Sequence, residues 1–225
     1  MPRHPTPAMI VFDVNETLSD MGPLTEAFAR VGLAPDERET WFAGLLRDGF
    51  ALTSVGENPN FAELAAEALR IRLVSHMDDV AAATAVESVM GTFNDLETHP
   101  DVVTGIRALR AAGVRLVTLS NGSTAVASGL LERAGVLDDL ESLMTVADGP
   151  AWKPAPGAYA HALGRCGVAA KDAMLVASHP WDIDGAARAG IRTAWLRRGA
   201  ASYPSYFQSP EIEATDLADL AAAIT

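Results

Sequence analysis

Short, strongly apolar runs separated by helical patterns constrain the fold of this chain more than any other feature. The clearest runs cover residues 9–12, 114–119 and 174–177, and shorter candidates cover residues 143–146 and 193–196. Each run is too short for an ordinary helix, and most of them follow a helical pattern that ends near a glycine. Strands that alternate with helices in this way predict an α/β fold with a doubly wound, Rossmann-like parallel sheet that carries helices on both faces.

The segment between the first two clear runs has a different pattern. Residues 22–95 contain several amphipathic helical patterns and no clear strand. A chain of 225 residues with 49% hydrophobic composition can bury one core plus a smaller appended unit. We therefore predict an α/β core domain made of residues 1–21 and 96–225, and a helical domain made of residues 22–95 that is inserted after the first strand.

Charge and composition exclude several classes of partner. The formal net charge is −12 and no Lys/Arg cluster stands out, which argues against binding to nucleic acid or to an anionic membrane. Cys166 is the single cysteine, so no intramolecular disulfide can form, as is usual in a reducing cytoplasm. The sequence shows neither the apolar segment of a signal peptide nor a run of roughly 18 apolar residues. We expect a soluble cytoplasmic protein that acts on a small molecule.

An acidic residue stands directly after the first apolar run. Asp13 ends the sequence MIVFD, and Thr17 follows four residues later. In open α/β sheets, ligands bind in the crevice outside the carboxyl ends of the strands. Asp13 is therefore a candidate for a reactive carboxylate in that crevice. The alternative interpretation is that Asp13 only caps the turn that follows the strand.

Three later motifs place further polar groups at the starts of helices. Ser120 and Asn121 follow a strand, where side-chain donors and free backbone N–H groups can hold an anion, although Ser120 could simply be an N-cap. Lys153, in KPAPGAY, could pair with Asp13 and keep it ionised and nucleophilic, whereas a solvated lysine is the ordinary alternative. The fourth motif, ASHPWDIDGA, contains Asp182 and Asp184.

These four motifs, in this order, resemble those of the haloacid dehalogenase superfamily over nearly the whole chain. The resemblance implies that Asp13 is the nucleophile of a hydrolase that works through an enzyme-bound ester, and that the helical insertion is a cap domain. Caps of this family often support dimers, so a homodimer is also expected.

The residue at position 15 separates two reactions of this superfamily. Its phosphatases place a second Asp two residues after the nucleophile as general acid and base, and they need Mg²⁺. Here that position is Asn15, whose amide cannot exchange a proton in this way. Expulsion of a halide needs no proton donor, because a halide is already a weak base. Asn15 therefore favours attack on carbon, although Asn is also common in ordinary turns.

The sequence is most similar to the type II L-2-haloacid dehalogenases, which share SNGS, KP followed by Tyr, and WD. This resemblance implies hydrolysis of small 2-haloacids to 2-hydroxy acids, without a metal or other cofactor. The residues that match the predicted catalytic positions are Asp13, Thr17, Lys153 and Asp182. The predicted substrate-binding residues are Asn15, Ser120, Asn121, Tyr159, Phe42, Arg47 and His179.

Two departures from that family concern the substrate. The family usually has an Arg after a cap Trp, where it is thought to receive the halide, but Trp41 is followed by Phe42. Arg47 lies five residues further along, about 140° around a helix, so it does not simply replace that Arg. Phe42 could instead be part of the packing of the cap. His179 replaces the family's Asn, and it could act near the hydrolytic water or be a polar residue at a strand end.

Two other functions remain open from the sequence. One is a Mg²⁺-dependent small-molecule phosphatase in which water or another acid replaces Asn15, with Asp182 or Asp184 as a metal ligand. The other is a catalytically weak, ligand-binding relative that retains the fold and the pocket.

Overall fold

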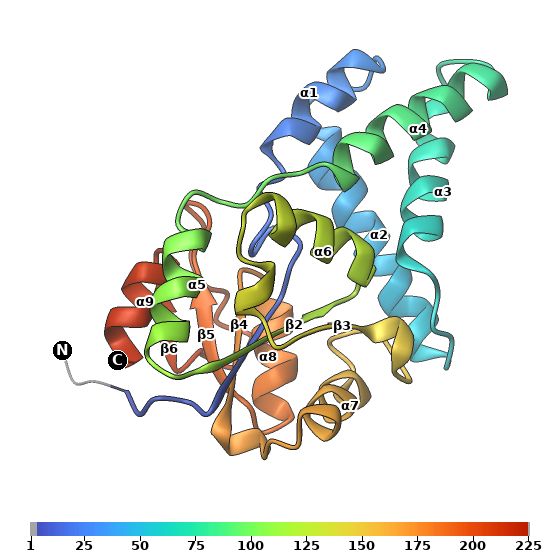
Figure 1. Ribbon diagram of the computed structural model, residues 1–225. Coiled ribbons are helices and arrows are strands. Elements are labelled where there is room, and N and C mark those ends of the chain that lie inside the picture. Colours follow the sequence, from blue (N-terminus) through green and yellow to red (C-terminus); the bar gives the residue numbers. More distant parts are fainter. Residues whose placement is uncertain (1–3, 225) are drawn as a thin grey trace.

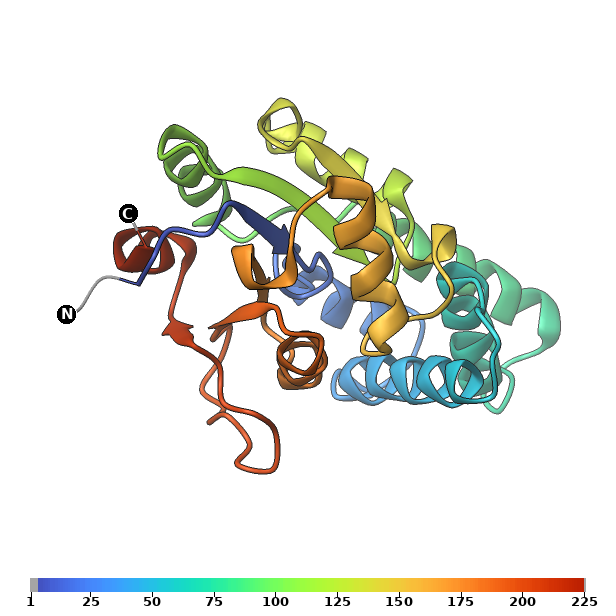
Figure 2. The same cartoon turned by 90° about the horizontal axis from the view of Figure 1, so that it is seen from below.

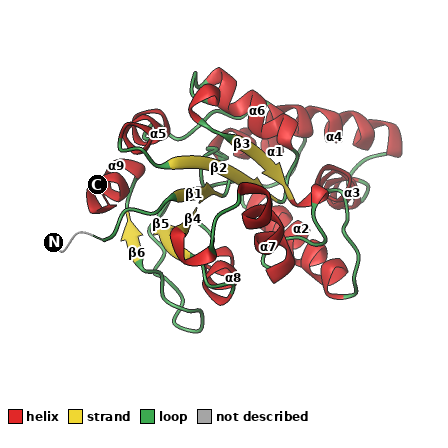
Figure 3. Cartoon of the chain, turned by 60° about the horizontal axis from the view of Figure 1, so that its bottom comes forward, coloured by secondary structure: helices red, strands yellow, loops and turns green. Residues whose placement is uncertain are grey.

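A parallel sheet forms the centre of the molecule. The computed structural model of the chain describes residues 4–224. In this part of the chain the strands lie in the order β3-β2-β1-β4-β5-β6 and every neighbouring pair is parallel, as the sequence predicted (Figure 3). Their bounds are β1 Met9–Phe12, β2 Arg115–Ser120, β3 Ser142–Thr145, β4 Ala173–Ala177, β5 Arg192–Leu196 and β6 Ile212–Ala214.

Helices cover both faces of the sheet because alternate strand residues point to opposite sides. Ile10 and Phe12 of β1 pack into one apolar cluster, whereas Met9 and Val11 pack into the other. The first cluster includes residues of the helices α5 Val102–Ala111, α6 Thr124–Arg133 and α9 Leu217–Ile224. The second includes residues of α7 Pro156–Cys166 and α8 Pro180–Arg188. The fully apolar sequence of β1 therefore reflects burial on both faces.

The predicted helical segment after β1 forms four helices. These are α1 Gly22–Arg30, α2 Glu37–Ser54, α3 Phe61–Leu73 and α4 Asp79–Asn94. Side chains cap two of them, because Asn60 accepts hydrogen bonds from the backbone at the start of α3 and Asp78 does so at the start of α4. The four helices pack against one another at one end of the sheet, away from the ends of the chain (Figures 1 and 2).

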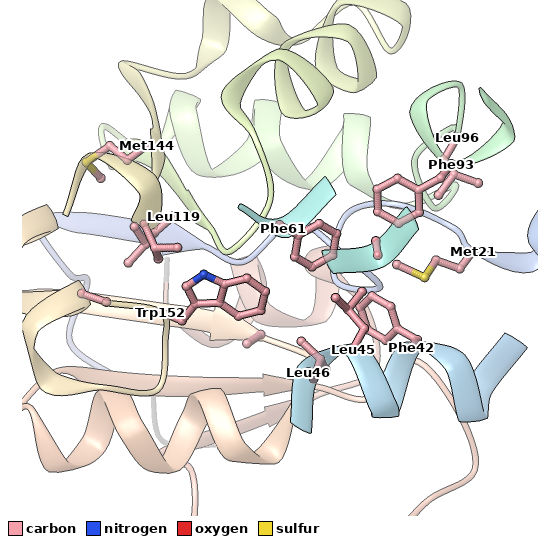
Figure 4. Close-up of a cluster of buried hydrophobic side chains, with 14 of the residues drawn as sticks. Met21, Phe42, Leu45, Leu46, Phe61, Phe93, Leu96, Leu119, Met144 and Trp152 are labelled. Atoms are coloured by element: carbon pink, nitrogen blue, oxygen red, sulfur yellow. The ribbon is translucent and has the colours of Figure 1, made fainter. Parts of the chain in front are cut away.

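An apolar contact holds the four helices against the rest of the molecule. Trp152 lies in the loop before α7, and its ring stacks on Phe61 of α3 with 5.6 Å between ring centroids (Figure 4). The indole Nε1 of Trp152 also donates a hydrogen bond to the carbonyl oxygen of Pro59 over 2.9 Å. On α2, a Cβ atom at Gly49 would lie 2.2 Å from the Trp152 ring, so only glycine permits this approach. The position of α2 over the sheet is therefore fixed by close packing.

The bounds of the five predicted strands agree with the observed bounds to within one residue. The prediction missed a sixth strand near the end of the chain. Strand β6 was not predicted, because it is three residues long and Glu213 interrupts its apolar pattern. Within residues 4–224, no helix is both long and apolar enough to cross a membrane.

Candidate active site

Asp13 lies at the carboxyl end of β1, where the predicted crevice begins. Its backbone N–H donates to the carbonyl oxygen of Val176 on the neighbouring strand β4, which fixes the main chain. One carboxylate oxygen, Oδ1, accepts from Lys153 Nζ at 2.8 Å. The other, Oδ2, accepts from Thr17 Oγ1 at 2.7 Å and lies 3.3 Å from Nδ1 of His179. Asp13 is buried, so protein groups rather than water surround its charge.

Lys153 joins Asp13 to a second buried carboxylate. Its Nζ atom lies 2.6 Å from Oδ2 of Asp182, which stands in the first turn of α8. The hydroxyl of Tyr159, from α7, donates to Oδ1 of Asp182 over 2.6 Å. Helix α8 can come this close because a Cβ atom at Gly185 would lie only 2.7 Å from the Tyr159 hydroxyl. Residues from the end of β1, the loop before α7, α7 and α8 thus form one hydrogen-bonded chain.

The charges of this cluster set its protonation. Burial opposes the charge of Lys153, but the Asp13 and Asp182 carboxylates outweigh burial and raise the lysine pKa. Burial also opposes ionisation of Asp13, yet Lys153 and His179 hold its pKa well below the usual range. Burial dominates at Asp182 and raises its pKa in spite of Lys153. Asp13 is consequently the carboxylate most strongly kept ionised, which is what a nucleophile requires.

Two residues at the end of β2 shape the wall beside this cluster. The side-chain amide of Asn121 donates to the carbonyl oxygen of Lys153 over 3.2 Å and accepts from its backbone N–H over 3.0 Å. The Ser120 hydroxyl accepts from the backbone N–H of Gly122, whereas Ser123 caps α6. Ser120 is therefore not the N-cap of that helix. Lys153 has a fully buried side chain, so it is not a solvated lysine either.

His179 connects Asp13 to a carboxylate that the sequence interpretation had not singled out. Its Nε2 atom lies 2.9 Å from Oε2 of Glu16, and its ring stacks on Trp181 with 5.1 Å between centroids. Burial favours neutral imidazole, but Asp13 and Glu16 outweigh it and raise the His179 pKa to about 9. The imidazole is thus protonated at neutral pH while Asp13 is ionised.

The backbone of Glu16 adopts an unusual conformation. Its φ of +60° lies in the left-handed region, which costs a residue other than glycine roughly 1–2 kcal/mol. Its backbone N–H donates to the Ser19 hydroxyl over 3.2 Å, and its carboxylate faces His179 and Arg38. Strained backbone that surrounding contacts hold in place is common at functional sites.

Two cavities meet at Glu16 and His179. The first has a volume of about 440 Å³, and its polar lining includes Arg38 and Ser178. The second has a volume of about 620 Å³, and its lining is mostly apolar. Its apolar lining residues are Phe42, Ala43, Leu46, Phe50 and Trp181. Asp13 lines neither cavity, whereas His179, whose ring contacts it, lines both.

The other predicted site residues are spread more widely. Phe42 is buried and its ring lies 6.1 Å from that of His179, so it both packs the insertion and borders the second cavity. Asn15 is buried beside Ser120 and Gly122. Arg47 also lines the second cavity, but its side chain is 74% exposed and pairs with Asp48, away from Asp13.

Asp184, considered as a metal ligand, also lies apart from the cluster. It faces away along α8 and pairs with Arg188. Within residues 4–224, no three His, Cys, Asp or Glu side chains are grouped so that they could hold a metal ion.

Four residues near Asp13 were missed from the sequence. Ser178 and Arg198 hold Thr17, since the Ser178 backbone N–H donates to the Thr17 hydroxyl and the Arg198 guanidinium donates to the Thr17 carbonyl oxygen. Glu16 and Arg38 are the other two. Arg38 could have been found, because it precedes Phe42 by four residues and therefore shares its face of α2. Glu16 could also have been found, because it is a charged residue between Asp13 and Thr17 in the sequence.

Comparisons with known proteins identify the family. The family model for haloacid dehalogenase-like hydrolases matches residues 8–190. Haloacetate dehalogenase H-2 of Moraxella sp. (strain B) is 29% identical over 207 residues, which cover 90% of this chain and 91% of that protein. (S)-2-Haloacid dehalogenase 1 of Pseudomonas sp. (strain CBS-3) is 29% identical over 191 residues, covering 84% of this chain and 83% of that protein.

A solved structure of a dehalogenase with an intermediate complex shares the fold, with a TM-score of 0.89 and 24% identity over 98% of both chains. The predicted α/β fold is therefore confirmed by both the sheet and its structural neighbours. Because the family model spans most of the sequence, including Asp13, Lys153 and Asp182, the chain belongs to the haloacid dehalogenase-like hydrolases.

Proposed function

We propose that this hydrolase cleaves the carbon–halogen bond of small 2-haloacids and produces 2-hydroxy acids. The observation that carries the proposal is the state of Asp13, an ionised and buried carboxylate held by Lys153, with Asn15 in place of a second acid. Two relatives that match nearly the whole chain are dehalogenases of haloacetate and of (S)-2-haloacids.

In the first step, an Asp13 oxygen attacks C2 of the substrate and the halide leaves with the electron pair of the carbon–halogen bond. The carboxylate becomes an ester, and its negative charge leaves with the halide. Lys153 and Thr17 bond to Asp13, so they orient it before the reaction. No proton donor is needed, which makes the amide of Asn15 acceptable at its position.

In the second step, water attacks the Asp13 carbonyl carbon, and His179 is placed to accept a proton from it. Esterification removes one of the two negative charges that hold the proton on His179, so the imidazolium releases that proton to solvent. Neutral His179, oriented by Glu16, then takes a proton from the attacking water. One water proton goes to the departing 2-hydroxy acid and the other stays on His179 as Asp13 regains its charge.

Lys153 has a further role in this second step. Its ammonium group faces the Asp13 oxygen on which negative charge develops when water adds to the ester. Asp182 holds this ammonium group, and Tyr159 in turn holds Asp182. We therefore assign Asp182 to orientation of Lys153, and Ser120 and Asn121 to the wall that holds the substrate.

We also propose that residues 22–95 act as a cap domain over a core of residues 1–21 and 96–225. In this arrangement Phe42 and Arg47 border the second cavity from the cap side and His179 borders it from the core. Asn15 contributes from a separate place, beside Ser120 and Gly122. A homodimer and a cytoplasmic location complete the proposal. Sedimentation equilibrium distinguishes a dimer from the 23.7 kDa monomer.

Release of halide from chloroacetate and (S)-2-chloropropionate tests the function directly. We expect stoichiometric halide and 2-hydroxy acid from the wild-type chain, and neither from Asp13→Asn. The rival phosphatase predicts hydrolysis of phosphate esters that depends on Mg²⁺ and stops with EDTA, without halide release. A chain inert toward both substrate sets would support the weak ligand-binding relative.

A further inference from the structure

Arg38 is a cation of the cap helix α2 that reaches the core beside the nucleophile. Its Nη1 atom lies 3.5 Å from Oε1 of Glu16, and its Nη2 atom lies 3.0 Å from Oε1 of Glu39. Its side chain is only 15% exposed, whereas that of Glu39 is 77% exposed. The guanidinium is thus held against the cavity of about 440 Å³, at the end where Glu16 and His179 form its wall.

The charges around this cavity favour an anion. Arg38, Arg197 and Arg198 line it, against the carboxylates of Glu16 and Asp20. His99 also lines it, but burial and the neighbouring Arg198 lower the pKa of His99, which favours its neutral form. A cationic cavity in a chain of net charge −12 concentrates anions at one place on an otherwise repelling surface.

Only part of this positive charge is available to a ligand. The Arg198 guanidinium is committed to the Thr17 carbonyl oxygen and to Asp101 at 2.7 Å. Arg38 has a looser partner, since 3.5 Å to Glu16 is long for a charged hydrogen bond. Glu16 remains bonded to His179 through its other oxygen, so loss of the Arg38 contact would not free it. Between these two residues, Arg38 is therefore the cation that can exchange its partner beside Glu16 and His179.

We propose that Arg38 binds the carboxylate of the substrate. On the Arg38 guanidinium, the substrate carboxylate takes the place of Glu16 Oε1. The inference rests on the proposed function, because it deepens that function by naming the residue that selects anionic substrates. A carboxylate matches the planar fork of a guanidinium, and one protein carboxylate already lies there. The substrate would then reach Asp13 with its charged end toward the polar cavity and its C2 substituent toward the apolar one.

Binding of the product measures this role without catalytic turnover. Calorimetric titration with (R)-lactate, the anion expected when displacement inverts C2 of (S)-2-chloropropionate, and with (R)-lactamide, its neutral analogue, compares the wild-type chain with Arg38→Gln and Arg38→Lys. We expect Arg38→Gln to weaken lactate binding about tenfold or more and lactamide binding less than about twofold, with Arg38→Lys intermediate. In Arg38→Gln, the KM for (S)-2-chloropropionate should rise by a factor similar to the rise in the Kd for lactate. The change in kcat should be smaller.

Arg70→Gln is the matched control, since Arg70 lies exposed on α3, pairs with Glu67 and lines neither cavity. Lactate binding unchanged by Arg38→Gln would overturn the proposal, and so would equal losses for lactate and lactamide, which indicate only a role in positioning Glu16. Titration with chloride provides a further check. If Arg38→Gln loses chloride binding but keeps lactate binding, the proposal is overturned and Arg38 is assigned to the halide instead. If the wild-type chain binds lactate but releases no halide, the proposed function fails while the Arg38 assignment is still decided by binding.

Discussion

The Nε2 atom of His179 lies 2.9 Å from a carboxylate oxygen of Glu16, although 163 positions separate the two residues in the chain. They meet because β1 and β4 are neighbours in the sheet, so the loops that follow these strands leave the same edge. The second ring nitrogen of His179 faces Asp13 at 3.3 Å. The imidazole is thus placed between Asp13 and a second carboxylate that fixes its orientation.

Replacement of His179 by Gln should slow hydrolysis of the ester more than its formation. We expect kcat to fall about 10²-fold, because the water loses its general base while Asp13 and Lys153 remain in contact. Intact-protein mass spectrometry after quenching should then show the ester accumulating on the variant. His76→Gln, at an exposed position, is the control. An unchanged kcat, or slower formation without accumulation, would contradict this role.

The raised pKa of His179 should make its contribution to stability depend on pH. The pKa is about 9 in the folded chain against an ordinary value of 6.5, so the folded state binds the proton more tightly. This contribution is fully present below about pH 6.5 and is lost as the pH rises through about 9. Urea unfolding at about pH 6.5 and pH 10 measures this effect. Between these pH values, the free energy of unfolding should fall by about 3 kcal/mol more for the wild-type chain than for His179→Gln. Parallel losses in the two chains would be the contrary result.

Lys153→Met should remove activity and destabilise the fold together. The substitution leaves the buried carboxylates of Asp13 and Asp182 without their common cation, which costs about 3–5 kcal/mol for a buried pair. Lys171→Met, at an exposed position, should be close to neutral and serves as the matched control. Denaturant unfolding measures the free energy. Equal stability of the two variants would show that the buried charges do not depend on Lys153.

Gly185→Ala tests whether α8 must approach the cluster this closely. A Cβ atom there would lie 2.6 Å from Pro154 Cβ and 2.7 Å from the Tyr159 hydroxyl, so we expect a loss of about 1–3 kcal/mol and lower activity. On α7, a Cβ at Gly164 meets nothing within 4 Å, so Gly164→Ala should be neutral or stabilising. If both variants unfold at the same denaturant concentration, α8 has more freedom than the packing indicates.

The sequence was sufficient for five of the six strands and for part of the cluster around Asp13, because of how buried parallel strands are built. Buried parallel strands are continuous apolar runs, and the residues after them gather at one edge, so the sequence predicts that Asp13 lies near the residues that follow β2 and β4. The contact of Arg38 with Glu16 could not be predicted, because it depends on how α2 packs over the sheet through Trp152 and Gly49. Local spacing does not encode that packing.

Isotope transfer to Asp13 tests the central claim most directly. In a single turnover of (S)-2-chloropropionate in H₂¹⁸O with enzyme in excess, water attacks the Asp13 carbonyl carbon, so one ¹⁸O should enter the Asp13 side chain and the lactate should remain unlabelled. Peptide mass spectrometry of the segment that contains Asp13 locates the label. Direct transfer of ¹⁸O to lactate, with Asp13 unlabelled, would contradict an ester on this residue.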